Sequence, residues 1–124
     1  MKVIIAGTRT ITDYAKVIEA IENSGFHLTE IVCGGASGVD ALGKRYGEEF
    51  NILVKVFKAD WDQYGRAAGP KRNEEMAKYA DGLVLVWDGK SRGSSNMLSL
   101  AHRYKLPVYT KLVVKNKKDA EITA

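Results

Sequence analysis

The chain has 124 residues, a formal net charge of +4, and hydrophobic and charged fractions of 45% and 27%. These values are ordinary for one globular domain and exclude the low-apolar, highly charged composition of disordered chains. No apolar run approaches the ~18 residues of a membrane-spanning helix, and Met1-Lys2 leads into a strand-like run instead of a signal peptide. We therefore expect one cytoplasmic domain over residues 1–114, with no membrane association.

Basic residues gather at the C-terminal end, where Lys111, Lys115, Lys117 and Lys118 lie within the last fourteen residues. Such a patch attracts the phosphate backbone of nucleic acids. A solvated tail explains the same charges, so we interpret residues 115–124 as a basic, flexible tail and keep nucleic acid as an alternative partner.

Cys33 is the only cysteine and lies in an apolar run. A single cysteine excludes an internal disulfide and a cysteine-based zinc cluster. We expect this thiol to pack in the core.

Short apolar runs alternate with segments of helical periodicity along the chain. Continuous apolar runs predict strands that are buried on both faces of a parallel sheet. In the first helix, Asp13 is the expected N-terminus and Ser24-Gly25 the expected C-terminal cap. In the second helix, Val39, Leu42, Tyr46 and Phe50 are expected to face the core. The expected strands are 2–6, 30–33, 53–57, 83–87 and 107–114, and the expected helices are 13–24, 39–50, 71–79 and 95–104, with a long loop at 58–70.

This alternation predicts the topology as well. Parallel crossovers are right-handed and place helices on both faces of a sheet. The order of elements therefore predicts an α/β fold: a single Rossmann-like, doubly wound sandwich of about five parallel strands and four helices.

Ligands of open α/β sheets bind outside the carboxyl ends of the strands, near the point where the strand order reverses. Glycines let the backbone approach an anion there, and the start of the next helix offers unpaired N–H groups. The sequence lacks the G-x-G-x-x-G fingerprint, so NAD is not implied. Three expected loops at this edge are rich in glycine, hydroxyls or arginine: Gly7-Thr8-Arg9-Thr10, Gly34-Gly35-Ala36-Ser37-Gly38-Val39-Asp40 and the segment 88–96.

In the third loop, Gly93 is followed by Ser94, Ser95 and Asn96 at an expected helix start. Hydroxyls at that position either cap the helix or bind a phosphate. Each glycine loop alone is equally consistent with a tight turn. Two such loops at one sheet edge favour a phosphate-binding site.

Four motifs of the sequence are distinctive: Gly7-Thr8-Arg9, Gly34 to Asp40, Gly69-Pro70-Lys71-Arg72-Asn73-Glu74-Glu75-Met76, and Trp87-Asp88-Gly89 with Ser91 to Met97. Together they resemble the SLOG superfamily, the Rossmann-like group that contains the Lonely Guy phosphoribohydrolases and the DNA-processing Smf proteins. The likeness is greatest to its small stand-alone YspA-like branch of bacteria and phages. The resemblance implies a nucleotide or nucleotide-derived ligand across the glycine loops, and subunits that associate into a homo-oligomer.

The same resemblance bears on catalysis. The hydrolases of the superfamily cleave the N-glycosidic bond of nucleoside 5'-monophosphates with an arginine of an R-x-x-x-M helix and a glutamate of a G-G-x-G-T-x-x-E loop. Arg72 and Met76 match the first motif, whereas Met97 occupies the position of the glutamate. Methionine can neither activate water nor stabilise an oxocarbenium-like sugar. We do not expect the known hydrolase mechanism, and Asp40 and Asp88 are the remaining candidate catalytic carboxylates.

We therefore predict a protein that binds a nucleotide as a sensor or a sequestering agent, without a cofactor or a metal. The alternatives are a divergent N-glycosidase or phosphoribohydrolase, and a single-stranded nucleic-acid binder. In the long loop, Trp61 or Tyr64 either stacks on a base or covers the core. The expected ligand-binding residues are Gly7, Thr8, Arg9, Gly34, Gly35, Ala36, Ser37, Gly38, Asp40, Arg72, Asn73, Asp88, Gly93, Ser94, Ser95 and Asn96.

Overall fold

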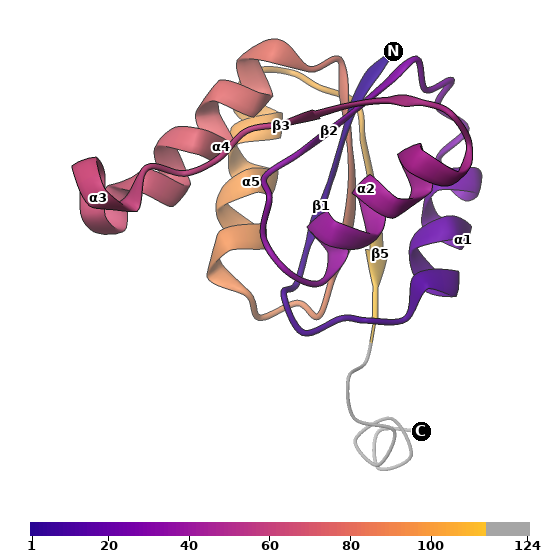
Figure 1. Ribbon diagram of the computed structural model, residues 1–124, viewed down its shortest axis with the longest axis horizontal. Coiled ribbons are helices and arrows are strands. Elements are labelled where there is room, and N and C mark those ends of the chain that lie inside the picture. Colours follow the sequence, from indigo (N-terminus) through magenta and orange to yellow (C-terminus); the bar gives the residue numbers. More distant parts are fainter. Residues whose placement is uncertain (114–124) are drawn as a thin grey trace, which may run out of the picture.

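A computed structural model describes residues 1–113 and contains a five-stranded, all-parallel sheet with helices on both faces (Figure 1). The predicted Rossmann-like fold is confirmed. The segment 115–124, interpreted above as a basic tail, lies outside the described residues. The strands are β1 (Lys2–Gly7), β2 (Glu30–Cys33), β3 (Leu53–Val56), β4 (Gly82–Trp87) and β5 (Val108–Leu112), in the order β3-β2-β1-β4-β5.

Six helical segments connect these strands. Helix α1 begins after Asp13, whose side chain accepts a hydrogen bond from the Ala15 N–H, and ends at Gly25 in the left-handed conformation. Both of these predicted helix ends are confirmed. The segments are α1 (Tyr14–Ser24), α2 (Val39–Glu49), α3 (Trp61–Tyr64), the 3-10 helix η1 (Gly65–Ala67), α4 (Ala68–Tyr79) and α5 (Arg92–Arg103).

Two apolar layers, one on each face of the sheet, form the core. In β1, Val3 and Ile5 pack with buried residues of α1 and α2, whereas Ile4 and Ala6 pack with buried residues of α4 and α5. Because alternate residues of a strand point to opposite faces, a strand covered by helices on both sides must be apolar throughout. This requirement explains the continuous apolar runs of the sequence.

The second helix differs from its prediction at Phe50, which lies just beyond α2, is 54% exposed and stacks on Tyr46 with ring centroids 4.5 Å apart. The other three residues, Val39, Leu42 and Tyr46, contact the core as predicted, whereas Phe50 follows the last residue of the helix. Two glycines of α2 are also buried. A Cβ at Gly43 would lie 2.7 Å from the Ile5 Cβ, and one at Gly47 would lie 2.3 Å from a Val54 methyl, so these glycines let α2 lie close to the sheet.

The predicted loop 58–70 is also partly helical. Asp60 caps α3 by accepting a hydrogen bond from the Gln63 N–H at 3.1 Å, and α4 already begins at Ala68. Pro70 lies in the first turn of α4, where a missing N–H costs no intrahelical hydrogen bond. A proline expected to precede the helix therefore lies inside its first turn. Figure 1 shows α3 projecting at one end of the molecule.

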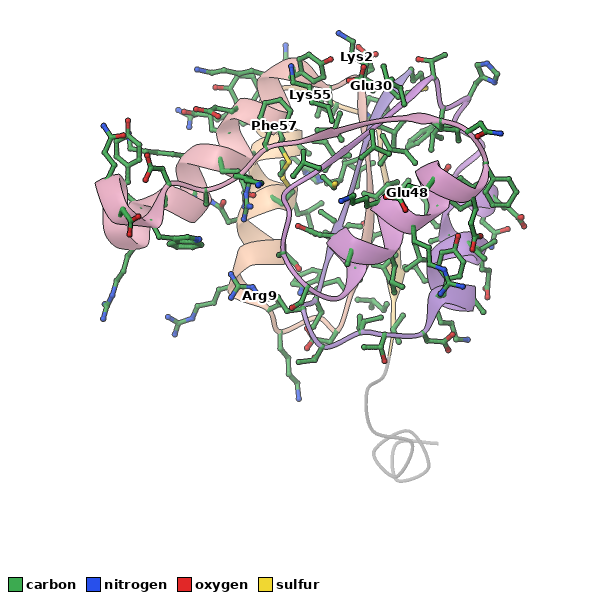
Figure 2. All side chains as sticks on the ribbon, viewed as in Figure 1. Lys2, Arg9, Glu30, Glu48, Lys55 and Phe57 are labelled. Atoms are coloured by element: carbon green, nitrogen blue, oxygen red, sulfur yellow. The ribbon has the colours of Figure 1, made fainter. Side chains whose placement is uncertain are left out.

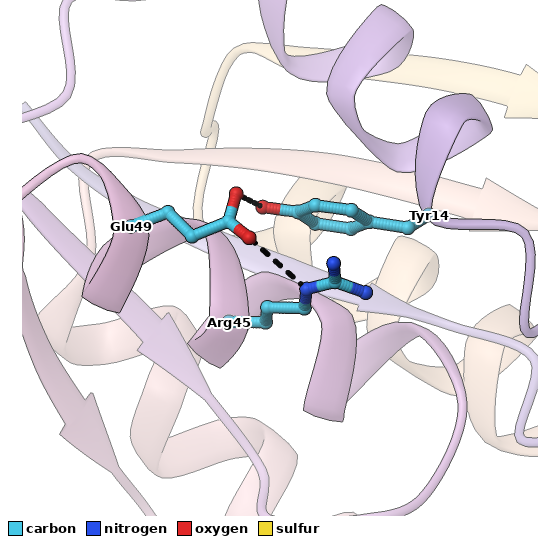
Figure 3. Close-up of polar contacts among 3 residues, drawn as sticks. All are labelled: Tyr14, Arg45 and Glu49. Carbon is cyan, nitrogen blue, oxygen red and sulfur yellow. Dashed lines mark hydrogen bonds and ion pairs between the residues drawn. The ribbon is translucent and has the colours of Figure 1, made fainter.

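A polar cluster joins α1 to α2 (Figure 3). The Tyr14 hydroxyl donates to Glu49 Oε2 at 2.7 Å, and Arg45 Nε donates to Glu49 Oε1 at 3.2 Å. The Arg45 guanidinium lies 4.0 Å from the centroid of the Tyr14 ring. Burial, together with the hydrogen bond to Glu49, raises the pKa of Tyr14 to about 12.

This pKa predicts a pH-dependent contribution to stability. The folded-state pKa lies above the ordinary value of about 10, so the contribution is complete below pH ~10 and is lost as the pH rises towards ~12. At pH 8, Tyr14→Phe should lower the free energy of unfolding by about 1 kcal/mol. Chemical unfolding of both proteins between pH 8 and 11 should show this difference shrinking above pH 10, and a difference that stays constant would contradict the role given to the hydroxyl.

Candidate functional site

The loops that follow β1, β2 and β4 meet at the carboxyl edge of the sheet. In the order β3-β2-β1-β4-β5, the chain leaves β1 towards β2 on one side, while β4 and β5 lie on the other side. The strand order therefore reverses beside β1, the place where open α/β sheets bind ligands. Two cavities of about 380 and 300 Å³ open there, and three residues line both of them: Arg9, Ala36 and Arg72.

The loop after β2 is shaped by two glycines with positive φ, Gly35 at 75° and Gly38 at 71°. A Cβ at Gly38 would lie 2.3 Å from the Arg9 carbonyl oxygen, so this position also requires a glycine for close approach. The Asp40 carboxylate closes the loop by accepting a hydrogen bond from the Ala36 N–H at 3.3 Å.

The start of α2 follows this loop. Gly38 is its N-cap residue and provides no side-chain hydrogen bond. The first N–H groups of a helix have no intrahelical acceptor and carry the positive end of its dipole. The first of them, the Val39 N–H, donates to the Thr8 carbonyl oxygen at 3.4 Å, so this helix start contributes to the site mainly through the positive end of its dipole.

Arg72 of α4 lies against the same loop. Its Nη1 donates to the Gly34 carbonyl oxygen, and its Nε donates to Asn73 Oδ1 at 2.9 Å. A Cβ at Gly34 would lie 2.7 Å from Arg72 Nη1 and 2.9 Å from Asp40 Oδ2. Glycine at position 34 therefore leaves the space in which the guanidinium and the carboxylate approach the backbone.

Burial shifts the pKa values of Asp40 and Arg72 in opposite directions. It raises the pKa of Asp40, which is only 7% exposed, while the Ala36 N–H and nearby Arg72 oppose the shift. It lowers the pKa of the Arg72 guanidinium, and nearby Asp40 opposes that shift. An arginine nevertheless stays charged in proteins. Arg72 therefore brings a positive charge to the wall of both cavities, next to the carboxyl group of Asp40.

Asn73 connects α4 to the start of α5. Its buried amide nitrogen donates to Asn96 Oδ1 at 3.0 Å and to the Gly93 carbonyl oxygen at 3.4 Å. Helix α5 begins at Arg92, three residues earlier than predicted, because Ser91 is its N-cap residue and accepts from the Ser94 N–H.

The expected residues of this region therefore divide into two groups. Asn73, Gly93 and Ser94 line the 300 Å³ cavity. Ser95 is exposed and lies outside both cavities, and Asn96 is hydrogen-bonded to Asn73 and also lies outside them.

Thr8 and Asp88 link neighbouring loops and line neither cavity. The Thr8 hydroxyl oxygen accepts from the Asp88 N–H at 3.1 Å. Asp88 Oδ1 accepts from the N–H groups of Lys90 and Ser91 at 2.9 and 3.0 Å, which turns the chain into α5. Of the two candidate catalytic carboxylates, Asp40 lines the 300 Å³ cavity and Asp88 lines neither of the two.

The remaining expected residues lie around the two openings. Gly7 lines the 300 Å³ cavity, and Gly34, Gly35 and Ser37 line the 380 Å³ cavity. Gly38 forms the turn without lining either one. Figure 2 labels Arg9 at the end of the molecule opposite Lys2 and Glu30, which begin β1 and β2.

Sequence reasoning missed several lining residues, namely Ala6, Met76 and Ser91 of the 300 Å³ cavity and Lys58 and Ala59 of the 380 Å³ cavity. The strand-end rule, applied to β3 as it was to its neighbours, would have indicated Lys58. Trp61, considered for stacking or for covering the core, is 50% exposed and lines the larger cavity. Met97 is 1% exposed and belongs to the core.

Comparison with known proteins identifies the family. A sequence model of the YspA, cpYpsA-related SLOG family matches residues 1–64. The Gene 61 protein of Mycobacterium phage D29 is 31% identical over 117 residues, a match that covers 86% of this chain and 93% of the phage protein. The chain belongs to this SLOG family. No solved structure matches it.

SLOG membership implies a nucleotide-related ligand. The family match includes the loops after β1 and β2, whereas Arg72 and the start of α5 lie beyond residue 64. Within residues 1–113, no helix is long and apolar enough to cross a membrane, and no cluster of three or more acidic, histidine or cysteine residues suits a metal ion.

Two glycine substitutions test the packing of the site. Gly34→Ala should lower the free energy of unfolding by about 1–3 kcal/mol, because its Cβ overlaps the space of Arg72 and Asp40. Gly93→Ala is the matched control: a Cβ there meets no atom within 4 Å, and alanine is the better helix former by about 0.5–1 kcal/mol. Urea unfolding measures both, and equal stability of the two variants would refute the close contact at Gly34.

Proposed function

We propose that this SLOG protein binds a nucleotide or nucleotide-derived ligand and acts as its sensor or sequestering agent. The observation that carries the proposal is the pair of arginines, Arg9 and Arg72, that line both cavities beside the glycine loop after β2. Guanidinium groups and backbone N–H groups around one opening are the donors that proteins use for phosphate.

The hydrogen bonds of Arg72 support this role. Nε and Nη1 are held by Asn73 and Gly34, and Nη2 has no hydrogen-bond partner within residues 1–113. The guanidinium of Arg9 forms neither a hydrogen bond nor an ion pair in the same part of the chain. Arg72 is thus held in place while its Nη2 group can still donate to a ligand, and Arg9 is exposed beside the cavities that it lines.

Trp61 supports a nucleotide over a simple anion. Its half-exposed ring lines the larger cavity together with Arg9 and Arg72. The ring is backed by α4, since a Cβ at Gly69 would lie 3.2 Å from it. Stacking of a base on an aromatic side chain contributes about 1–3 kcal/mol, so phosphate donors and a stacking surface in one cavity match the two ends of a nucleotide.

A binding role without hydrolysis agrees with the position of Met97. The residue at the place of the hydrolases' glutamate is a core methionine that lines neither cavity. Asp40 accepts the Ala36 N–H and lies beside Arg72, so its carboxylate already has a structural task.

One observation favours a second candidate, a divergent N-glycosidase. Asp40 lines the 300 Å³ cavity, and burial raises its pKa, as is common for carboxyl groups in acid–base catalysis. Chromatography of bound nucleotide after prolonged incubation distinguishes the two functions. Release of free base that is lost in Asp40→Asn would establish the enzyme, and intact nucleotide would support the binding protein.

Affinity measurements test the binding role directly. A thermal-shift screen of nucleoside mono- and diphosphates and dinucleotides should yield at least one stabilising ligand, because a ligand at 100 times its Kd adds about 2.7 kcal/mol of stability. Arg72→Ala should weaken the binding of that ligand about 10- to 150-fold. This is the effect of losing one hydrogen bond to a charged group, which contributes about 1.5–3 kcal/mol.

Arg103→Ala is the matched control, because Arg103 is an exposed arginine near the end of α5 whose contact with Glu74 spans 3.9 Å. Its affinity for the same ligand should equal that of the unaltered protein. The proposal fails if nothing shifts the melting temperature, or if Arg72→Ala binds as tightly as Arg103→Ala. Salt-sensitive binding of oligonucleotides alone would favour a nucleic-acid binder instead.

A further inference from the structure

We propose that the ligand contains a pyrophosphate that joins one nucleoside to a second nucleoside or to a sugar, and we call this a two-ended ligand. This inference rests on the proposed nucleotide-binding function and names the ligand class more closely. It is carried by the arrangement of the two cavities, which meet at the same two arginines instead of forming one pocket with a phosphate at its end.

The sizes of the compartments support a ligand larger than a mononucleotide. The outer compartment, which contains Trp61, measures about 380 Å³, and the inner compartment, which contains Asn73, measures about 300 Å³. Each lies near the lower limit of the ~300–1,000 Å³ typical of small-molecule sites. A nucleoside monophosphate with its base on Trp61 and its phosphate at the arginines leaves the inner compartment to water.

The chemistry of the two compartments differs. The outer one presents the ring of Trp61 and the cation Lys58. The inner one presents the hydroxyl-bearing residues Ser91 and Ser94, together with Gly93 at the start of α5. An aromatic base fits the outer compartment, and a hydroxyl-rich sugar or a second nucleoside fits the inner one.

The charges of the shared wall fit two adjacent phosphates. Arg9, Arg72 and Lys58 bring three positive charges to the two compartments, and among residues 1–113 the only acidic side chain lining either of them is Asp40. That carboxylate is buried and already accepts the Ala36 N–H. Both arginines line both compartments, so they can bind the two adjacent phosphates of a pyrophosphate. Two phosphates at opposite ends of a ligand would not both lie beside them.

The test compares ligands that differ only in their second end. Isothermal titration calorimetry at one salt concentration measures the affinity for four ligands: the nucleoside monophosphate, the diphosphate, the diphosphate-linked sugar and the diphosphate-linked dinucleoside. The measurement is repeated with adenine, guanine, uracil and cytosine as the base. In the preferred series, a two-ended ligand should bind at least tenfold tighter than the diphosphate, and the diphosphate tighter than the monophosphate.

Gly93→Leu tests which compartment holds the second end. A Cβ at Gly93 meets no atom within 4 Å and leucine is a good helix former, so the larger side chain can occupy the inner compartment while the helix is kept. The tenfold preference for the two-ended ligand should fall to threefold or less in this variant. Trp61→Ala should lower the affinity for the diphosphate and for the two-ended ligand by a similar factor, because both ligands place a base on the Trp61 ring.

Thermal unfolding confirms that each variant is folded, and Arg103→Ala should keep the full preference. Mono- and diphosphates that bind as tightly as every two-ended ligand would overturn this inference and leave the nucleotide-binding function intact. A preference that survives Gly93→Leu would also overturn it. No binding in any series would overturn the proposed function itself, so the two failures are distinguishable.

Discussion

The interaction on which the site depends is the contact of the Arg72 guanidinium with the backbone of Gly34. It requires a glycine directly after β2, the nearby carboxylate of Asp40, and Arg72 of α4, a helix that packs on the opposite face of the sheet from α2. A half-buried guanidinium is costly without partners. The Gly34 carbonyl, Asn73 and the nearby Asp40 provide them, so the loop and the arginine hold each other in place.

Through this contact, α4 fixes the two segments that border the cavities, the loop after β2 and the start of α5, with two consecutive residues. Arg72 holds the loop after β2, and Asn73 holds the start of α5 through Gly93 and Asn96. The cavities therefore lie between elements whose relative positions are set by hydrogen bonds as well as by the apolar core. Donors that are already in position lose little conformational freedom when a ligand binds, which favours affinity.

Most of the fold was predictable from the sequence because a parallel sheet covered on both faces demands continuous apolar strands, and β1 meets that demand after Lys2 while β4 meets it throughout. Features that depend on tertiary packing were not predictable in this way. Phe50 has the right spacing for the core, but α2 ends before it and its side chain is 54% exposed, while Val39, Leu42 and Tyr46 contact the core as predicted.

Strand ends and glycine loops mark a sheet edge and thereby indicated Arg9 and Gly34, and the family resemblance indicated Arg72. In the structure all three residues line one cavity. The separate tasks of neighbouring polar residues were not. Ser91, Ser94 and Ser95 are alike in sequence, yet the register of α5 makes the first its N-cap, buries the second and leaves the third exposed, so that only the first two line the 300 Å³ cavity.

The same register explains why the proposed binding role differs from hydrolysis by more than one side chain. Helix α5 begins at Arg92 and turns position 97 into the apolar layer that it shares with α4 and the sheet. A carboxylate at a position that is 1% exposed would lose its hydration and favour its neutral form. A glutamate at position 97 would therefore lack both the charge and the access to the cavity that water activation requires. The two arginines that line both cavities come from α4 and from the loop after β1, so they do not depend on the register of α5. Two independent features, these arginines and the buried methionine at position 97, thus support the proposal of a protein that binds its ligand without hydrolysing it.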